Sequence, residues 1–561
     1  MTQKAWKIKN PDSLLQRKLA RDLSISHLSA QLLINRGITS ADCAREFLGS
    51  GISALHKPEL LPDIDKAARR VRKALSAKEK VLLFSDYDAD GLTSLALLKR
   101  AFIRLGVDCE HYLPHRIAEG YGLSAKAVKY ARCGGFHLVV TLDCGIANFK
   151  EIEELRKSNI DTIVIDHHMV PEPLPPAHSV INPKRADSKY PYPDLAGVGL
   201  SYKFASYLLD ELLEEELDLV CLGTVADVAP LLGENRILVK EGLKKLNARS
   251  RLGLKSLAEI SGIKQKAIDT RQISYILGPR LNACGRIGSA EDALSLLLVD
   301  EEEQALALAG QLHSKNKERG RIEAEIIDEA LCKIETEMDF SRERVIVLHQ
   351  EGWHQGVLGI VAAKISDRYH RPAIVISFND GIGKGSGRSI ENFHLFEGLR
   401  ECKEHLLGFG GHKRACGLSL SRGAVNDFRR AINEVALRTL SLQDLAPALD
   451  IELEPELSGL SLDLLEELRL FEPFGQGNPR PIFATCNLQV KSAATVAGRD
   501  TLKFWVSDGK ATYPAVGFGM GRYLDLVNSA RTIDLAYRLS LDTYQGNHQL
   551  QLELEDIRLS K

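Results

Sequence analysis

The sequence predicts an α/β protein whose largest domain is a doubly wound parallel sheet, followed by a smaller α/β domain and a β-barrel. Apolar runs such as Val81–Ser85, Leu138–Leu142 and Thr162–Ile165 are typical of strands buried on both faces of a sheet. Stretches with helical spacing separate these runs, as in repeated βαβ units. Beyond residue 450, short β-runs separated by turn residues replace this alternation, which indicates a barrel.

Length and composition favour a globular protein of several domains in a reducing compartment. At 561 residues the chain is too long for one core, and its net charge of −2 argues neither for nor against a nucleic-acid partner. The ten cysteines include no CxxC pair, so neither a disulfide framework nor a zinc knuckle is expected. No signal-peptide region or membrane-length apolar run is visible, so we expect a cytoplasmic monomer without a membrane segment.

Residues 1–60 predict a short helical segment, and residues 61–300 predict the domain that carries the chemistry. Its strand Val81–Ser85 runs into a helix with apolar residues at Leu92, Leu95 and Leu98. Between strand and helix stand Asp86, Asp88 and Asp90. Ligands bind at the carboxyl ends of strands in such sheets, and three adjacent carboxylates repel one another unless cations neutralise them. This loop therefore predicts a metal site.

Further polar residues follow other predicted strands of the same sheet. Leu138–Leu142 leads to Asp143, Thr162–Ile165 leads to His167 and His168, and Cys221–Ala226 leads to Asp227. Each of these residues alone is more often a helix cap or an ordinary core or surface side chain. Four such loops at the strand ends of one sheet favour a shared site.

The types of ligand indicate which metal this site would hold. A carboxylate-rich, thiol-free set with two imidazoles favours Mn²⁺ or Mg²⁺ over structural zinc. Six or seven ligands suit two divalent cations better than one, and a pair of ions both generates a nucleophile and stabilises the leaving oxygen of a phosphoryl displacement. The sequence therefore predicts phosphoester hydrolysis.

The same residues form an ordered set of motifs that resembles the DHH phosphoesterase family. The motifs are Asp86-Tyr87-Asp88-Ala89-Asp90-Gly91, Thr141-x-Asp143-x-Gly145, Asp166-His167-His168 and Asp227-x-x-Pro230. The resemblance implies that Asp88, Asp90, Asp143, His167, His168 and Asp227 are metal ligands or their partners. For Asp86 it leaves two roles open, a direct ligand or a residue that orients one.

Two further stretches resemble the substrate-binding loops of the family's bacterial single-strand exonucleases. One contains Arg116 and Glu119-Gly120-Tyr121-Gly122, and the other is Pro279–Arg286, which we expect to be a loop containing Arg280, Asn282 and Arg286. Arginine forks match phosphate oxygens. An Ala/Leu/Glu/Lys-rich stretch over residues 301–340 predicts a connecting helix, and we interpret its basic run Lys315–Arg321 as a solvated face.

Residues 341–440 predict a second α/β domain that resembles the DHHA1 domain. Its Gly385–Ser389 and Gly408–Lys413 segments read as glycine-rich loops. A loop of the first kind can hold a phosphate through backbone N–H groups and an arginine. The resemblance implies that Ser386 and Arg388 bind substrate phosphate, and that His412 contacts phosphate or acts near the leaving group. Trp353 is interpreted as a core residue.

Residues 441–561 predict an OB-fold, a common single-strand binder. Five β-runs support it: Asn487–Lys491, Leu502–Ser507, Tyr513–Phe518, Asp534–Leu541 and Gln549–Leu554. Turns are expected at Asp508-Gly509 and at Gln545-Gly546-Asn547. The candidate strand contacts, about half of which we expect to be barrel core, are Phe504, Trp505, Tyr513, Phe518 and Arg522.

Together these features predict a single-stranded-DNA-specific 5′→3′ exonuclease of DNA recombination and repair. It would release 5′-mononucleotides by two-metal-ion hydrolysis, with Arg116, Arg280, Arg286 and Arg388 holding the phosphates. Two alternatives remain: a DHH-family hydrolase of short oligonucleotides or cyclic dinucleotides, and a non-catalytic DHH replication scaffold. As further partners, the resemblance implies a single-strand-binding protein and a RecQ-like helicase.

Overall fold

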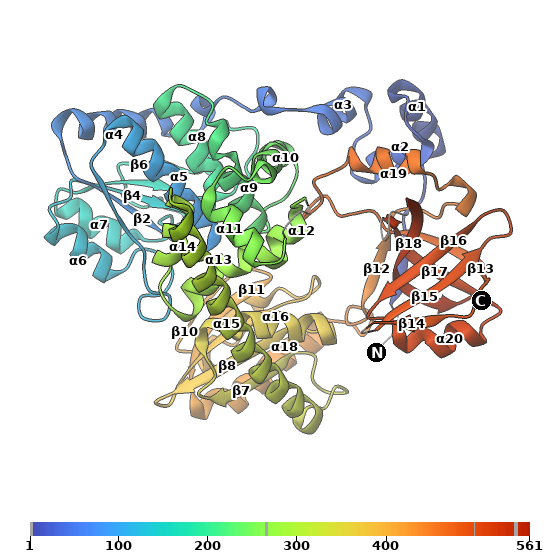
Figure 1. Cartoon of the computed structure of the whole chain (residues 1–561). Coiled ribbons are helices and arrows are strands. Elements are labelled where there is room, and N and C mark those ends of the chain that lie inside the picture. The colour runs from blue at the N-terminus through green and yellow to red at the C-terminus, as the bar shows by residue number, and fades with distance from the viewer. Residues whose placement is uncertain (1–3, 264–266, 499, 543–547, 561) are drawn as a thin grey trace. The chain divides into compact units, whose positions relative to one another are not determined.

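The computed structural model describes residues 4–263, 267–498, 500–542 and 548–560 (Figure 1). The chain forms two compact units. Residues 55–445 make up the first, while residues 1–54 and 446–561 together make up the second. Within the described ranges, no helix combines the length and the apolar character that crossing a membrane requires.

The first unit begins with a five-stranded, fully parallel sheet in the order β3-β2-β4-β5-β6. Its strands are β2 (Val81–Ser85), β3 (Cys109–Tyr112), β4 (Leu138–Leu142), β5 (Asp161–Ile165) and β6 (Ser179–Ile181). The connecting helices are α4 (Ile64–Ala77), α5 (Ala89–Leu105), α6 (Ala125–Cys133), α7 (Phe149–Lys157) and α8 (Gly197–Leu209). The predicted doubly wound sheet is confirmed. Its strand order reverses between β2 and β4, the position where such sheets bind ligands.

A group of helices completes this first domain. They are α9 (Leu217–Ala226), α10 (Gly233–Ala248), α11 (Leu252–Ile260), α12 (Thr270–Gln272), the π-helical turn η4 (Ile273–Leu277), α13 (Gly278–Ile287) and α14 (Glu291–Leu298). Two predictions were wrong here. Cys221–Ala226 is the end of a helix rather than a strand, because a short apolar run is equally typical of a buried helix. Pro279–Arg286 is helical because proline fits the first helical turn.

Helix α15 (Glu302–Glu337) connects this domain to the next one, as predicted (Figure 1). The next sheet has the order β10-β11-β9-β8-β7, in which only the β7–β8 pair is parallel. Its strands are β7 (Ile346–Glu351), β8 (Ala373–Asn379), β9 (Ile382–Arg388), β10 (Gly408–Gly411) and β11 (Ala415–Ser421). The helices are α16 (Leu358–Tyr369), α17 (Leu395–Glu401) and α18 (Val425–Thr439).

The glycine-rich segments of this domain correct the prediction of two loops. Ser386 and Arg388 lie on strand β9, and the loop predicted at Gly408–Lys413 begins with strand β10. Glycines on β9 leave room for large apolar neighbours: a Cβ at Gly383 or Gly385 would come within 3 Å of Ile376. The glycines therefore serve sheet packing as well as turns. Trp353 is buried, as interpreted from the sequence.

The second unit contains a closed barrel. Its strands are β13 (Phe483–Val490), β14 (Thr495–Ala497), β15 (Thr501–Ser507), β16 (Thr512–Phe518), β17 (Thr532–Asp542) and β18 (Gln549–Leu559). β13 pairs with both β15 and β17, and β16 pairs in parallel with β18, which closes the sheet as in an OB-fold. Helix α20 (Leu524–Ser529) lies between β16 and β17 in sequence. The predicted turn at Gln545-Gly546-Asn547 lies outside the described residues.

The N-terminal segment folds onto this barrel. Strand β1 (Ala5–Ile8) pairs in parallel with β12 (Ala448–Ile451), which the sequence did not predict. The predicted helical segment consists of α1 (Ser13–Leu23), α2 (His27–Asn35) and α3 (Ala41–Gly49), and it lies beside α19 (Leu462–Arg469). Leu32, Leu33 and Ala44 join the same hydrophobic core as Phe504. The two ends of the chain thus build one unit.

Replacing Trp6 with alanine should destabilise the second unit by about 2 kcal/mol, because a half-buried aromatic and a hydrogen bond are lost. Trp6 Nε1 donates to Asp556 Oδ2 at 2.8 Å, and the Arg558 guanidinium lies 3.9 Å from the ring centroid. We expect the melting temperature of this unit to fall by about 4–8 °C in calorimetry. Trp505→Ala is the control, since Trp505 is 39% exposed on the same unit. Equal shifts for the two variants would contradict the role of β1.

Candidate active site

The loop between β2 and α5 holds its carboxylates in fixed positions. Asp88 caps α5, because its Oδ1 accepts from the backbone N–H groups of Asp90 (3.0 Å) and Gly91 (3.1 Å). Asp86 is buried, and its Oδ1 has no hydrogen-bond partner among the described residues. Gly91 is required here, since a Cβ would lie 2.5 Å from the Asp86 carbonyl oxygen. The turn thus packs too closely for a side chain at its closing residue.

Asp90 connects this loop to the start of helix α8. Its Oδ2 accepts from Gly197 N at 2.7 Å and its Oδ1 from Val198 N at 2.8 Å. A Cβ at Gly197 would lie 3.0 Å from both Asp90 Oδ2 and Asp143 Oδ1. Gly197 therefore lets the helix N-terminus approach two carboxylates, and its positive end stabilises their charge. Sequence reasoning missed this glycine because nothing in its neighbours indicates the close approach.

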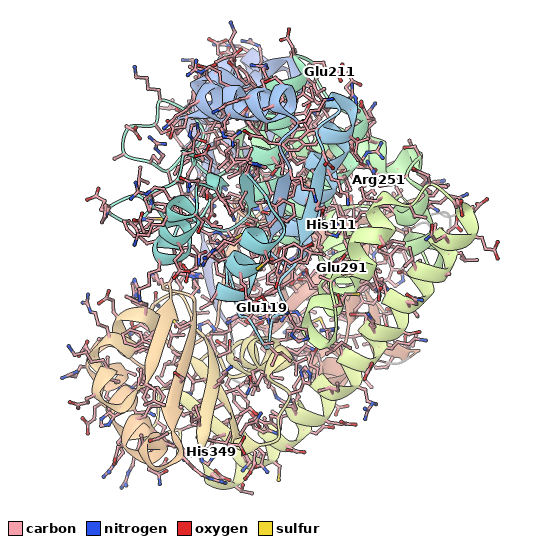
Figure 2. All side chains as sticks on the ribbon, turned by 90° about the vertical axis from the view of Figure 1, so that its left-hand side faces the viewer. His111, Glu119, Glu211, Arg251, Glu291 and His349 are labelled. Atoms are coloured by element: carbon pink, nitrogen blue, oxygen red, sulfur yellow. The ribbon has the colours of Figure 1, made fainter. Side chains whose placement is uncertain are left out.

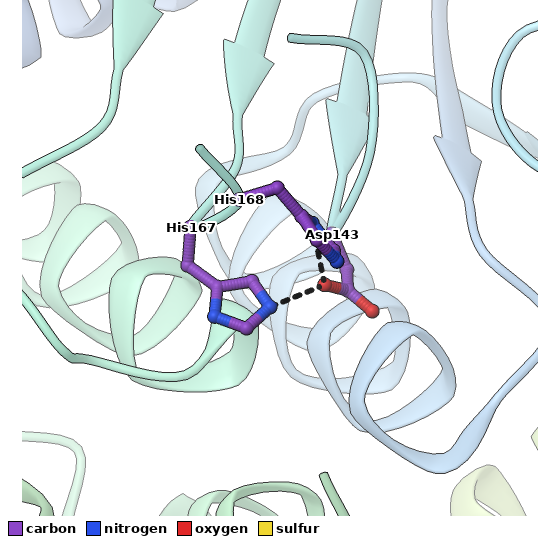
Figure 3. A group of neighbouring side chains, drawn as sticks. All are labelled: Asp143, His167 and His168. Atoms are coloured by element: carbon purple, nitrogen blue, oxygen red, sulfur yellow. Dashed lines mark ion pairs between the residues drawn. The ribbon is translucent and has the colours of Figure 1, made fainter. Parts of the chain in front are cut away.

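Asp143, His167 and His168 come together at the ends of β4 and β5 (Figure 3). Asp143 Oδ1 lies 3.2 Å from His167 Nε2 and 3.9 Å from His168 Nδ1. Asp143 has a φ of 57°, a left-handed conformation that aspartate tolerates better than most residues. Strained backbone at this position is typical of functional sites.

Asp166 and Tyr121 orient His168, a role that the sequence prediction did not assign. The His168 Nδ1–H donates to Asp166 Oδ1 at 2.8 Å, and Asp166 also accepts from the backbone N–H groups of His168 and Ile146. Tyr121 OH donates to the Asp143 carbonyl at 3.0 Å and lies 3.1 Å from His168 Nδ1. Such partners leave the other imidazole nitrogen available for a metal. The adjacent Asp166-His167-His168 sequence was the available signal.

Asp227 approaches from the C-terminus of α9, with its Oδ2 3.8 Å from His167 Nε2. The seven side chains form three overlapping groups whose ligand atoms lie within 4.8 Å of one another: Asp90, His167 and Asp227; Asp143, His167 and His168; Asp86, Asp88 and Asp143. Asp143 Oδ1 and His167 Nε2 are buried without hydrogen-bond partners among the described residues. This arrangement fits two neighbouring divalent cations, with Asp143 and His167 in more than one group.

The pKa values show how strongly the carboxylates need counter-charge. Burial first, and then the charge of Asp88, raises the pKa of Asp90 to about 7. Burial, Asp90 and Asp88 raise the pKa of Asp227 to about 9. Burial and Asp90 hold the pKa of Asp143 well above its usual range. Burial and His168 lower the pKa of His167 to about 3, so its ring is neutral and can bind a metal.

These shifts predict how the stability of the metal-free protein depends on pH. A carboxyl group whose pKa is higher in the folded protein than in the unfolded chain contributes stability that is fully present below about pH 4, the unfolded pKa. That contribution is lost as the pH rises through about 7 for Asp90 and about 9 for Asp227. The increase in melting temperature on adding Mg²⁺ should therefore grow between pH 6 and pH 8.5, because cations replace the lost protons. In the Asp227→Asn variant, the Mg²⁺-dependent increase in melting temperature should change less between these two pH values. An equal change would contradict the role of Asp227 as a metal ligand.

Arg116 lies beside the acidic loop. Its guanidinium is 5.1 Å from the centroid of the Tyr87 ring. The segment carrying it is anchored by Glu119 (Figure 2), which accepts hydrogen bonds from Tyr112 OH (2.8 Å), His115 N (3.0 Å) and Ser124 Oγ (2.6 Å). These bonds hold the predicted substrate loop in place. Burial and the charge of Asp88 hold the pKa of Asp86 well above its usual range, and the charge of Arg116 opposes that rise. Burial and then the charge of Arg116 lower the pKa of Arg388, so Arg116 lies near both the acidic loop and the second domain.

The second domain contributes Ser386 and Arg388, and the charge of Arg116 acts on Arg388. Arg388 Nη1 donates to Ser386 Oγ at 3.2 Å. A Cβ at Gly359, in the first turn of α16, would lie 2.9 Å from Arg388 Nη2 and 3.0 Å from Ser386 Oγ. A serine hydroxyl, an arginine and a helix N-terminus form a typical anion site. The pKa of His412 is lowered by burial, then by the charges of Arg388 and His168, so His412 faces both domains.

Helix α13 brings the remaining predicted residues to this region in different roles. Burial, then Arg116, Arg319 and Arg388, lower the pKa of Arg286 to about 10, and its Nη1 donates to Gly356 O at 3.3 Å. Asn282 Oδ1 accepts from Ala89 N at 2.7 Å, so it supports the acidic loop. Arg280 turns toward α15, where its Nε donates to His313 Nδ1 at 3.3 Å. Arg286 thus lies near Arg116 and Arg388, whereas Asn282 positions the acidic loop between β2 and α5.

The fold and the site define a class of protein, the metal-dependent phosphoesterases of DHH type. Family models agree along the chain. The DHH family N-terminal domain matches residues 80–224, the DHHA1 domain matches residues 342–437 and the RecJ OB domain matches residues 450–556.

The chain belongs to the RecJ family. It is 35% identical to the single-stranded-DNA-specific exonuclease RecJ of Bacillus subtilis over 99% of this chain and 71% of that protein. The RecJ of Escherichia coli is 34% identical over 94% of this chain and 95% of its own length. The crystal structure of Thermus thermophilus RecJ in complex with Mn²⁺ matches with a TM-score of 0.86 and 29% identity, covering 99% of this chain and 80% of that one. The Mg²⁺ complex matches with a TM-score of 0.79.

Proposed function

We propose that this protein is a metal-dependent exonuclease that degrades single-stranded DNA from its 5′ end and releases 5′-mononucleotides. One observation carries the proposal: seven side chains able to ligate metal and the hydrogen-bonded pair Ser386 and Arg388 occur in one compact unit. The first group suits phosphodiester hydrolysis, and the second suits a terminal phosphate. The single-strand specificity in the names of the relatives supports the choice of substrate.

Asp86, Asp88, Asp90, Asp143, His167, His168 and Asp227 would hold two divalent cations, Mn²⁺ or Mg²⁺. When bound, the cations supply Lewis-acid activation of water and neutralise charge on the transferred phosphoryl group. Asp86 belongs to a ligand group with Asp88 and Asp143, which favours a direct role over the orienting role. Asp166 holds the His168 ring through Nδ1, and Asn282 fixes the backbone of the acidic loop.

The remaining residues would bind and orient the strand. Arg116, Arg286 and Arg388 hold successive phosphates by charge-assisted hydrogen bonds, and Ser386 with Arg388 receives the 5′-terminal phosphate. Arg280 continues this basic set along α13. His412, on the β10–β11 hairpin, contacts phosphate or the leaving oxygen. These contacts order the strand so that cleavage starts from one end.

The barrel would bind the single strand before it reaches the metal site. Trp505 is 39% exposed and Phe518 is 65% exposed on neighbouring strands, whereas Phe504 is buried in the barrel core. Exposed aromatics stack bases without reading sequence. We assign Trp505, Phe518 and Arg522 to this surface. Phe504 and Tyr513 belong to the core, because Tyr513 packs against it and its OH donates to Leu460 O at 2.7 Å.

The cellular setting is part of the proposal. All ten cysteines are free thiols, which supports a cytoplasmic location. A monomer, a role in recombination and repair, and the partnership with a single-strand-binding protein and a RecQ-like helicase rest on the resemblance described above. We propose domain boundaries at residues 60, 300, 340 and 440.

The proposal is tested with one oligonucleotide labelled at its 5′ or its 3′ end, single-stranded or annealed, with Mn²⁺, Mg²⁺ or EDTA. We expect early release of a labelled 5′-mononucleotide from the single strand alone, and no release in EDTA. Early release of the 3′ label would overturn the polarity. Cleavage restricted to dinucleotides or cyclic dinucleotides would favour the short-substrate alternative. DNA that is bound and never cut would favour the scaffold alternative.

A further inference from the structure

The inward face of helix α15 is apolar toward both ends of the helix and polar in its middle. Ala305, Ala309 and Leu312 are buried toward its start, and Ile326, Ala330 and Ile334 are buried toward its end. Between them, at the same three- and four-residue spacing, stand Asn316, Arg319 and Glu323. Packing alone favours apolar residues along such a stripe. The polar interruption therefore requires another explanation.

Arg319 is held in one orientation by its two neighbours on this stripe. Its Nε donates to Asn316 Oδ1 at 3.1 Å, and its Nη1 donates to Glu323 Oε2 at 2.7 Å. Glu323 is itself buried and forms a second ion pair with Lys364 of α16. Arg319 Nη2 makes no hydrogen bond with any residue that the structure describes. The guanidinium is thus fixed while part of its donor capacity is unused.

Two arginines of helix α13 lie near Arg319. Helix α13 packs against α15, and Arg280 reaches α15 through its hydrogen bond to His313. Burial and then the charge of Arg319 lower the pKa of Arg280, and burial followed by Arg116, Arg319 and Arg388 lowers the pKa of Arg286. The hydrogen-bond partners of those two arginines are neutral: Ile276 O at 2.6 Å and His313 Nδ1 at 3.3 Å for Arg280, and Gly356 O at 3.3 Å for Arg286. In the described parts of the chain, only Glu323 forms an ion pair with any of the three arginines. The charge of Asp88 also acts on Arg286, so two carboxylates, Glu323 and Asp88, act on three guanidinium groups.

Such a cluster is unfavourable unless an anion joins it, because partly buried like charges repel one another and lose hydration. We propose that Arg319 is a substrate-positioning residue that forms, with Arg280 and Arg286, a binding subsite for a backbone phosphate of the bound strand. This subsite adjoins the Ser386–Arg388 site, because the charge of Arg388 also acts on Arg286, and it makes the connecting helix part of the substrate path. The inference rests on the proposed function. It also revises our interpretation of Lys315–Arg321 as a solvated face, since Arg319 is only 16% exposed.

The test compares Arg319→Gln with Arg321→Gln. Both arginines lie on α15 and pair with a glutamate four residues later, but the Arg321 side chain is 66% exposed. We expect Arg319→Gln to raise KM for a single-stranded oligonucleotide about tenfold with little change in kcat, because a charge-assisted phosphate contact is lost. The salt dependence of Kd, measured in an Asp143→Asn background, should weaken by about 0.7 in slope. Arg321→Gln should match the parent protein in both measurements.

Arg319→Lys provides a second test if the Arg319→Gln variant folds poorly. A lysine retains the positive charge. We therefore expect the salt dependence of Kd to equal that of the parent protein, with a Kd within about threefold of the parent value. Equal effects of Arg319→Gln and Arg321→Gln, or an unchanged salt slope in Arg319→Gln, would overturn the inference. A parent protein that neither binds nor cuts single-stranded DNA would instead overturn the proposed function, so the two failures are distinguishable.

Discussion

Replacing Asp143 with asparagine should lower kcat by about a thousandfold or more, while single-stranded DNA binding remains within a few fold of the parent protein. Asp143 belongs to two of the three ligand groups, so the change removes a negative ligand from both. DNA binding depends instead on arginines and on the barrel. The measurements are kcat with Mn²⁺ on a labelled oligonucleotide and Kd by fluorescence anisotropy.

Asparagine is the informative substitution at this position because it adopts the left-handed backbone of Asp143 readily. Alanine would add strain of about 1 kcal/mol. Asp210→Asn is the matched control, since Asp210 also has a left-handed φ of 55° but is exposed at the end of α8. Its activity should equal that of the parent protein. Full activity in Asp143→Asn would contradict the metal assignment.

Replacing Arg388 with glutamine should lower kcat/KM for a 5′-phosphorylated single strand by about 10- to 100-fold. The Arg388 guanidinium, Ser386 Oγ and the first turn of α16 form the anion site, so the loss should depend on the terminal phosphate. The parent protein should prefer the 5′-phosphorylated strand over the 5′-hydroxyl strand, and the variant should lose this preference. The measurement is kcat/KM for both strands in both proteins.

Lys384→Gln is the control for this prediction, because it removes a charge from an exposed position on the same strand β9. It should leave the preference for the 5′-phosphate unchanged. If Arg388→Gln reduced kcat/KM equally for both strands, Arg388 would contact an internal phosphate, and another residue would recognise the 5′ end.

The acidic site was predictable because its residues follow strands in short, ordered motifs. Parallel strands end at one edge of a sheet, so Asp86, Asp143 and His167 could be expected to meet from sequence alone. Asp227 was placed correctly near them, although the preceding segment is a helix and not a strand. The error did not affect the predicted position of Asp227, because the C-terminus of a buried helix can place a side chain where the end of a strand would.

Other features depend on contacts between residues far apart in the chain. The pairing of β1 with β12 joins segments separated by more than 400 residues, and neither short segment signals its partner. In the sequence, the polar residues Asn316, Arg319 and Glu323 of α15 are typical of a charged, exposed helix. The structure shows that α13 packs against α15. Asn282 reads as a substrate residue until its hydrogen bond to Ala89 shows that it supports the acidic loop.

The sequence by itself determined the α/β class, the OB-fold and the set of candidate metal ligands, because periodicity and adjacent motifs are local properties. Only the tertiary structure decided which candidate ligands lie within 4.8 Å of one another, that Asp166 and Tyr121 hold the His168 ring, and that helix α13 packs against α15 beside Arg319. These facts depend on burial and on distances between elements. Burial and neighbouring charges change the pKa and the hydrogen-bonding of a group without leaving a pattern in the residues beside it.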